Sequence, residues 1–142
     1  MGIKDASNMG AAMAPAFVDT LITHFNDTGR NPSYYDLIIS GDLGHIGKSI
    51  ATDIALSEGY NIKSNYNDCG VLIFDKENQD THSGGSGCAC CGSVFSGYLF
   101  NQLKMKKVSK ILLIATGALT NSVTSQQGES IPGIAHAVSI EC

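Results

Sequence analysis

The stretch YDLIISGDLGHIGKSIATDIALSEG, residues 35–59, changes from the pattern of a strand to the pattern of a helix across a single turn. Residues 35–40 form a short apolar run that Gly41 closes, which is typical of a buried strand. After the turn, Gly59 ends a segment whose apolar residues recur at helical spacing: Ile46, Ile50, Ile54 and Leu56. A buried strand followed by such a helix is the repeating unit of sheets whose faces are covered by helices.

The rest of the chain extends this alternation on both sides. Before it, the segment from Pro15 to Gly29 predicts an amphipathic helix with Pro15 in its first turn. After it, we predict a strand over residues 71–74 and a helix from Gly85 to Lys106. Two further strands are predicted over residues 110–119 and 133–141, with only a polar loop between them.

The resulting order is helix, strand, helix, strand, helix, strand, strand. It predicts an α/β fold with a mostly parallel mixed sheet, helices on both faces, and an antiparallel last pair of strands. A unit of this kind normally begins with a strand, and the opening residues MGIKDASNMG do not favour one. We therefore expect the first strand of the unit to be missing from this chain.

The composition is that of one globular domain. Of the 142 residues, 43% are hydrophobic and 15% are charged, which is enough apolar content for a core. Nine Lys and Arg against thirteen Asp and Glu give a net charge of −4, and the basic residues cluster only at residues 104–107. Binding to nucleic acid needs a basic face, and the lysines of this one cluster are explained by the end of a helix, where they meet its negative pole. The sequence therefore argues against nucleic acid as a partner.

The five cysteines are odd in number and partly adjacent, and no apolar run of a signal peptide precedes them. We expect reduced thiols and a cytoplasmic location. No apolar run approaches the length of a membrane-spanning helix, so membrane association is expected only through partners.

The stretch HSGGSGCACCGSVFSGYLF, residues 82–100, is the most unusual part of the sequence because it is apolar or small on every side of the predicted helix. Such a helix is expected to be buried all round and to approach another backbone closely at its glycines. Three other interpretations stay open. They are a metal site at the cysteines, an anion cradle at SGGSG, and a nucleophilic Cys88 assisted by His82.

Six motifs in order carry a resemblance to a known family: DASNMGAAMAPA, YDLIISGDLGHIGK, DCGVLIFD, QDTHSGGSGCACC, ATGAL and QQGESIPGIAHAVSIE. Together they resemble the C-terminal half of the stage V sporulation protein AD family, thiolase-like proteins of spore-forming bacteria. The resemblance covers residues 1–142 as a single C-terminal thiolase-like domain, about half of the family's usual two-half protein. It implies that the helix of residues 85–106 lies in a central layer between two sheets.

The same resemblance implies that the chain is not an enzyme. The C-terminal half of a catalytic thiolase supplies a histidine before a glycine turn, an asparagine and an acid-base cysteine. His82 lies near the first position. The second lines up near Gly41 and Asp42, so the asparagine is missing, and the third falls near Gln126 or Gln127, where there is no cysteine. The nearest cysteine in sequence is Cys142, and the nucleophile of these enzymes comes from the other half.

What the resemblance implies instead is binding of dipicolinic acid, alone or with calcium, and a part in its uptake into the developing spore. Expected partners are dipicolinic acid, the N-terminal half of the same fold or another copy, and other stage V sporulation proteins of the uptake complex. The expected location is peripheral, on the cytoplasmic side of the forespore or spore inner membrane. No cofactor is expected other than accompanying calcium.

The residues that this resemblance makes candidates for ligand binding share a place near the interlayer cleft: Asp42, His45, His82, Ser86 and Cys88. Asp42 is expected to repel a dianion unless calcium lies between them. Two alternatives to binding stay open. One is a thiolase or ketoacyl synthase type of acyl-transfer or condensing enzyme whose nucleophile lies in a missing N-terminal half, and the other is a nonfunctional fragment.

Overall fold

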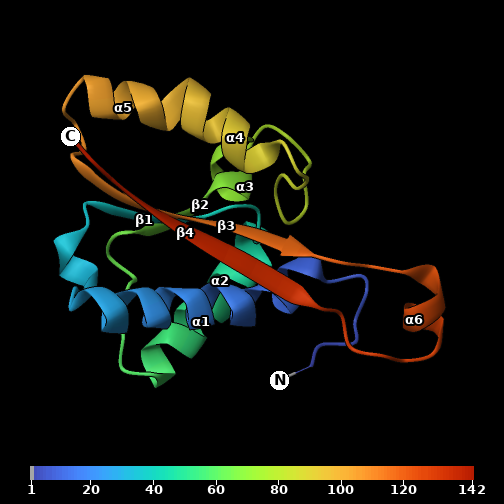
Figure 1. Ribbon diagram of the computed structural model, residues 1–142. Coiled ribbons are helices and arrows are strands. Elements are labelled where there is room, and N and C mark those ends of the chain that lie inside the picture. Colours follow the sequence, from blue (N-terminus) through green and yellow to red (C-terminus); the bar gives the residue numbers. More distant parts are fainter. Residues whose placement is uncertain (1) are drawn as a thin grey trace.

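The computed structural model describes residues 2–142 and has a single four-stranded sheet (Figure 1). The strands lie in the order β2-β1-β3-β4. Both neighbours of β1 are parallel to it, and β3 and β4 are antiparallel. The bounds are β1 Leu37–Ser40, β2 Tyr66–Asp68, β3 Lys110–Ala118 and β4 Gly133–Glu141. The predicted α/β class, mixed sheet and antiparallel last pair are confirmed.

Helices cover both faces of this sheet (Figure 1). One face carries α1 (Met9–Thr28) and α2 (Gly44–Ser57), and the other carries α4 (Cys90–Val94), a π-helical segment (Phe95–Leu99) and α5 (Phe100–Lys104). Three short helices complete the chain: a 3-10 turn (Pro32–Tyr34), α3 (Cys69–Leu72) and α6 (Ser122–Gln126). Figure 1 shows α6 at the tip of the long β3–β4 hairpin.

Helix α1 begins earlier than its sequence pattern predicts. The side chain of Asn8 accepts a hydrogen bond from the Ala11 N–H at 3.0 Å and so caps the helix. Pro15 therefore lies inside α1 and not in its first turn, which corrects the prediction. The other end agrees with it, because Gly29 closes the helix with a left-handed φ of 66°.

The strand predicted over residues 71–74 is wrong. The second strand is the preceding segment, β2, and the chain turns into α3 directly after it. The reason is Asp68, whose side chain accepts a hydrogen bond from the Val71 N–H at 3.2 Å and caps α3. The apolar side chains that suggested a strand are partly exposed around this short helix, including Ile73 and Phe74.

The third helix begins at Cys90 and not at Gly85. Residues 83–89 form a loop that passes close to α3, and the Gly85 N–H donates to the Gly70 carbonyl at 2.7 Å. Gly84 and Gly87 have φ values of 111° and 115°, which side-chain-bearing residues rarely adopt. The glycines of SGGSG therefore serve a turn and not a helix.

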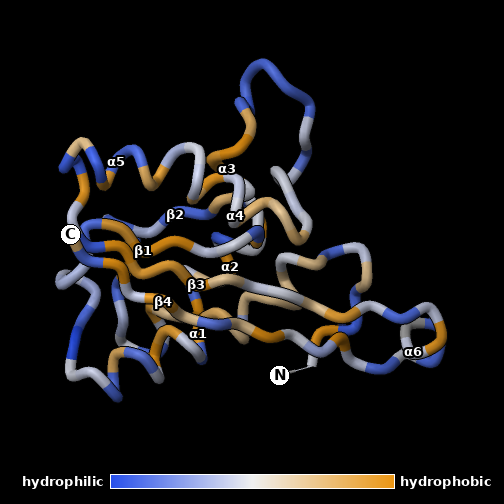
Figure 2. Tube along the Cα trace, turned by 45° about the horizontal axis from the view of Figure 1, so that its top comes forward, coloured by the Kyte–Doolittle hydropathy of each residue, from blue (hydrophilic) through white to orange (hydrophobic). Residues whose placement is uncertain are grey.

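Two hydrophobic clusters hold the layers together. The larger one lies between the sheet and α1 and α2, and it includes Phe17, Leu21 and Ile38. The smaller one lies under α4 and α5, and it includes Ile39 and Ile111. Figure 2 shows hydrophobic residues gathered on the central strands and hydrophilic residues in the loop that follows α3.

The helix that runs from α4 to α5 is covered on one side only. Cys90, Val94, Leu99 and Leu103 are buried against the sheet. On its outer side Tyr98 and Phe100 are each 51% exposed, and a Cβ added at Gly92 or Gly97 would meet nothing within 4 Å. Within this chain the helix is therefore buried on one side only, and no other backbone approaches Gly92. The predicted burial on all sides would need a cover from outside this chain.

No helix within residues 2–142 combines the length and the apolar character needed to cross a bilayer.

A glycine exchange tests the open side of this helix. Replacing Gly92 with Ala should raise the free energy of unfolding of this chain by about 0.5–1 kcal/mol, because alanine favours a helix and open space receives the methyl group. Chemical denaturation followed by circular dichroism measures the change. As a matched control, Gly70→Ala should lower stability, because its Cβ would lie against the Gly85 carbonyl oxygen. A loss of stability in Gly92→Ala would show that the helix is covered.

Candidate functional site

The candidate site lies where the carboxyl ends of β1 and β3 meet. From β1 the chain passes through α2 to β2 on one side, whereas α4 and α5 lead to β3 on the other side. The connections therefore diverge on opposite faces of the sheet between these two neighbouring parallel strands. Such a switch point, at the carboxyl ends of the strands, is where open α/β sheets bind ligands.

Asp42 ties three segments together at this point. Its Oδ1 accepts a hydrogen bond from the Thr116 hydroxyl at 3.0 Å, and its own N–H donates to the Thr116 Oγ1 at 3.3 Å. Its Oδ2 accepts from the Ser86 hydroxyl at 3.2 Å and from the Gly87 N–H at 2.9 Å. The carboxylate thereby holds the loop of residues 83–89 against the end of β3, and three donors stabilise its charge.

A pocket of about 340 Å³ opens beside Asp42. Its size is in the range that holds a small organic molecule. One wall is apolar and comes from α1, a second comes from the end of β3, and the third carries two thiols and the Ser86 hydroxyl. The lining residues are Met9, Met13, Asp42, Ser86, Gly87, Cys88, Cys91 and residues 115–118.

Three of the five predicted site residues, Asp42, Ser86 and Cys88, line this pocket, and the two histidines do not. The N–H of His45 donates to the Ser83 carbonyl at 2.7 Å, but its side chain lines a separate groove along α2. Burial lowers the pKa of His45. The His82 side chain is 90% exposed and lies 3.8 Å from the Asp80 carboxylate in the outer loop.

The residue that sequence reasoning missed is Asp68, at the end of β2. Its carboxylate is fully buried and accepts hydrogen bonds from the Ser40 hydroxyl at 2.6 Å, the Leu43 N–H at 2.8 Å and the Gly44 N–H at 2.9 Å. Burial raises the pKa of Asp68, and these donors oppose the rise. The Tyr66 hydroxyl lies 2.8 Å from the Ser40 Oγ and completes the network. Asp68 thus shapes the turn that presents Asp42.

The described residues contain no group of three or more His, Cys, Asp or Glu side chains placed to hold a metal ion. At the pocket, Asp42 is the one carboxylate among the lining residues. A calcium ion there would need further oxygen ligands from a bound molecule or from another chain, because calcium takes six to eight.

Comparison with known proteins identifies the family of this chain. A sequence model of the family described as Stage V sporulation protein AD (SpoVAD) matches residues 1–141. The chain belongs to the stage V sporulation protein AD family.

A curated relative shows how much of such a protein this chain represents. The chain is 44% identical over 141 residues to Stage V sporulation protein AD of Bacillus subtilis (strain 168). That match covers 99% of this chain and 41% of the relative. The chain therefore spans about two fifths of the length of this stage V sporulation protein AD relative.

The buried carboxylate provides a test of how the site is built. Asp68→Asn should lower the free energy of unfolding by about 1–3 kcal/mol, because its amide group would face backbone N–H donors that the carboxylate now satisfies. Urea denaturation at neutral pH measures the loss. Asp53→Asn, an exposed change on α2, is the matched control and should alter stability little. Equal effects of the two substitutions would contradict the role given to Asp68.

Proposed function

We propose that this chain acts in sporulation by binding dipicolinic acid, alone or with calcium, and serves dipicolinate uptake into the developing spore without catalysing a reaction. Membership of the stage V sporulation protein AD family supports the sporulation role. The pocket beside Asp42 is the observation that carries the binding proposal, because it lies at the switch point of the sheet and suits a small molecule.

The pocket offers the two kinds of surface that a planar aromatic dianion needs. Met9 and Met13 give an apolar wall for the ring. The helix that starts at Cys90 beside the pocket has no side-chain cap, and the dipole of its first turn favours an anion. Because Asp42 already accepts three hydrogen bonds, its repulsion of a carboxylate is reduced.

Calcium would change the part played by Asp42. Without the ion, its negative charge opposes the carboxylates of dipicolinate. With the ion, the same carboxylate supplies one calcium ligand while dipicolinate supplies others. The charge of Asp42 therefore weakens binding of free dipicolinate and strengthens binding of dipicolinate with calcium.

The positions that serve acid-base chemistry in thiolases support a role without catalysis. Gln126 lies at the end of α6 at the hairpin tip, and Gln127 follows it. Cys142 follows β4 beside the start of β3, since Glu141 pairs with Lys110, and so lies at the opposite end of the sheet from Asp42. Gln126, Gln127 and Cys142 therefore place no thiol in the pocket beside Asp42.

One observation favours the alternative, an acyl-transfer or condensing enzyme. The Cys91 thiol lines the same pocket, and its interaction with the neighbouring Cys69 thiol lowers its pKa. A thiolate in a pocket is the nucleophile of such enzymes. Incubation with an acyl thioester and mass analysis of Cys88 and Cys91 separates the alternatives, because acylation of either thiol would favour the enzyme.

The open side of α4 to α5 supports a partner for this chain, either the N-terminal half of the same fold or another copy. Tyr98 and Phe100 are half exposed there, and β4 is an edge strand on which Ile134 and Val138 are more than half exposed. Exposed apolar surface and an open sheet edge both favour association.

Dipicolinate binding is tested by calorimetric titration of this chain and of a longer protein that contains both halves. We expect binding to the longer protein and weak or no binding to this chain alone. Asp42→Asn should strengthen binding of free dipicolinate by about 1 kcal/mol and should remove any gain that calcium gives. The exposed Asp27→Asn on α1 is the control and should change neither. Absence of binding to the longer protein would refute the proposal.

The partner proposal predicts that this chain alone self-associates. Sedimentation velocity over a range of concentrations should show species larger than the monomer. Tyr98→Ser with Phe100→Ser should shift the chain toward monomer, because both changes remove apolar surface from the open side. Leu119→Ser, at the exposed hairpin, is the matched control and should leave the association unchanged. A monodisperse monomer that unfolds cooperatively would contradict the prediction.

A further inference from the structure

We propose that Cys88 and Cys91 form a redox-active dithiol that reacts with small-molecule disulfides and closes to an intramolecular disulfide. This modification site is independent of the proposed ligand, because it rests on the arrangement of the thiols alone. Three features carry it: the spacing of the two cysteines, their shared pocket, and the buried thiol of Cys69 behind Cys91.

Cys88 and Cys91 are separated by two residues at the start of a helix. The Cys90 N–H donates to the Gly87 carbonyl at 3.0 Å, and the Ser93 N–H donates to the Ala89 carbonyl at 2.9 Å, so the chain already turns here. Cys88 lies just before the N-cap residue Ala89, and Cys91 lies in the first turn of α4. Both thiols line the pocket of about 340 Å³, with Cys88 exposed and Cys91 half-buried. The two-residue spacing is that of dithiols that cycle between reduced and oxidised forms.

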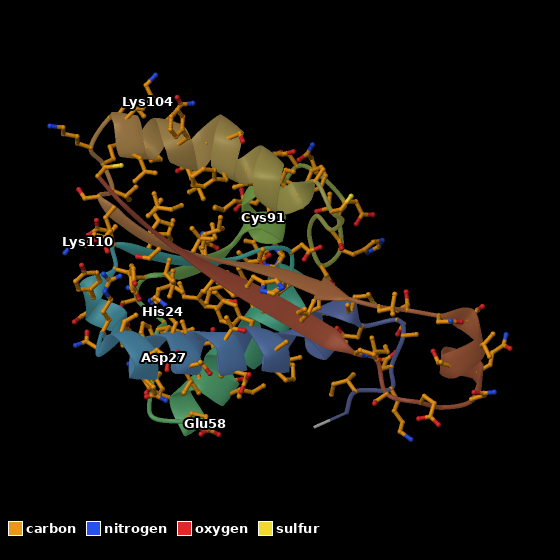
Figure 3. All side chains as sticks on the ribbon, in the orientation of Figure 1. His24, Asp27, Glu58, Cys91, Lys104 and Lys110 are labelled. Atoms are coloured by element: carbon orange, nitrogen blue, oxygen red, sulfur yellow. The ribbon has the colours of Figure 1, made fainter. Side chains whose placement is uncertain are left out.

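Cys91 is the attacking thiol of the pair. Figure 3 shows it on the side of α4 that is turned toward the sheet. Cys69 is fully buried, and its interaction with Cys91 lowers the pKa of Cys91 and raises that of Cys69. Burial and the nearby carboxylates of Asp42 and Asp68 act against this by raising the pKa of Cys91. Cys69 therefore keeps its proton and supports a thiolate at Cys91.

Cys90 does not take part, although it is adjacent in sequence. Its side chain is buried in the smaller hydrophobic cluster with Val94 and Leu99. Burial raises the pKa of Cys90 to about 11, so it stays a thiol near neutral pH. The pair is thus Cys88 with Cys91, and the intervening thiol is a core residue.

With oxidised glutathione as the reagent, the reaction balances in two steps. The Cys91 thiolate attacks one sulfur of the glutathione disulfide, forms a mixed disulfide, and releases one glutathione as its thiolate. The Cys88 thiolate then attacks the Cys91 sulfur and releases the second glutathione. The two protons of the dithiol pass through solvent to the two glutathione thiolates, and two electrons pass from the protein dithiol to oxidised glutathione.

The test equilibrates the chain at pH 7 in glutathione buffers of increasing oxidation, in a Cys142→Ser background that removes the exposed terminal thiol. After acid quenching, mass spectrometry should show a species lighter by two hydrogen atoms. Trypsin should place the disulfide inside the peptide of residues 77–104 and leave Cys69 reduced in the peptide of residues 64–76. Cys90→Ser should retain the disulfide, and Cys91→Ser should lose it. Cys88→Ser should stop at a glutathione adduct on Cys91.

A second measurement needs no substitution at the pair. Short treatment of the unaltered chain with iodoacetamide should alkylate Cys91 faster than Cys142, an exposed thiol that serves as an internal reference. Cys69→Ala should slow alkylation of Cys91 by about two- to tenfold, the range expected for the loss of one polar interaction that lowers the pKa of Cys91, and should not slow Cys142. A disulfide that joins the two peptides, or Cys91 alkylation no faster than that of Cys142, would overturn the proposal.

Discussion

The buried carboxylate of Asp68 is the interaction on which the carboxyl end of the sheet depends. It lies at the end of β2, bonds Ser40 at the end of β1, and satisfies the N–H groups of Leu43 and Gly44 where α2 begins. It also caps α3 through the Val71 N–H. A single side chain therefore joins two strands to the starts of two helices. Because a buried carboxylate is costly without such partners, each of these bonds constrains the others.

The two aspartates at this edge of the sheet, Asp42 and Asp68, have different roles because their side chains differ in exposure. Asp68 is enclosed and serves the protein itself, whereas Asp42 is partly exposed and lines the pocket. Asp42 lies one residue before Leu43, so the bond from Leu43 to Asp68 fixes the backbone that presents Asp42. The loop that carries Ser86 and Cys88 is then held by Asp42. The position of the accessible Asp42 therefore depends on the buried Asp68.

Sequence reasoning predicted the sheet but not its details. The strand of residues 35–40, the helix after it and the final pair of strands were identified because their apolar spacing is regular. The segment 71–74 was assigned to a strand because a run of four apolar residues does not distinguish a strand from a short helix. The three-residue β2 lies in a polar segment, so periodicity gave no signal for it. Asn8 as a helix cap and the turn at Gly84 and Gly87 are local bonding and backbone effects that spacing does not reveal.

The candidate site was predicted in part, and that prediction came from the family resemblance. Asp42 lies near the pocket because it follows a buried strand, and parallel strands bring their carboxyl ends to one edge of the sheet. Ser86 and Cys88 reach the same edge through the loop of residues 83–89. His82, just before that loop, has a left-handed backbone with a φ of 48°, and its side chain is exposed. A sequence does not disclose such a turn at a non-glycine residue.

The π-helical segment Phe95–Leu99 determines which way the long helix faces. The Phe100 N–H bonds the Phe95 carbonyl, five residues back, instead of a carbonyl four residues back. Val94 and Leu99, five positions apart, are both buried, whereas a regular α-helix would turn the second by about 140° from the first. The wider turn absorbs one extra residue without rotating the apolar side away from the sheet. A relative with one residue fewer here and a regular α-helix would bury side chains at the same four positions. The length of the chain can therefore change at this point without turning the apolar side of the helix away from the sheet.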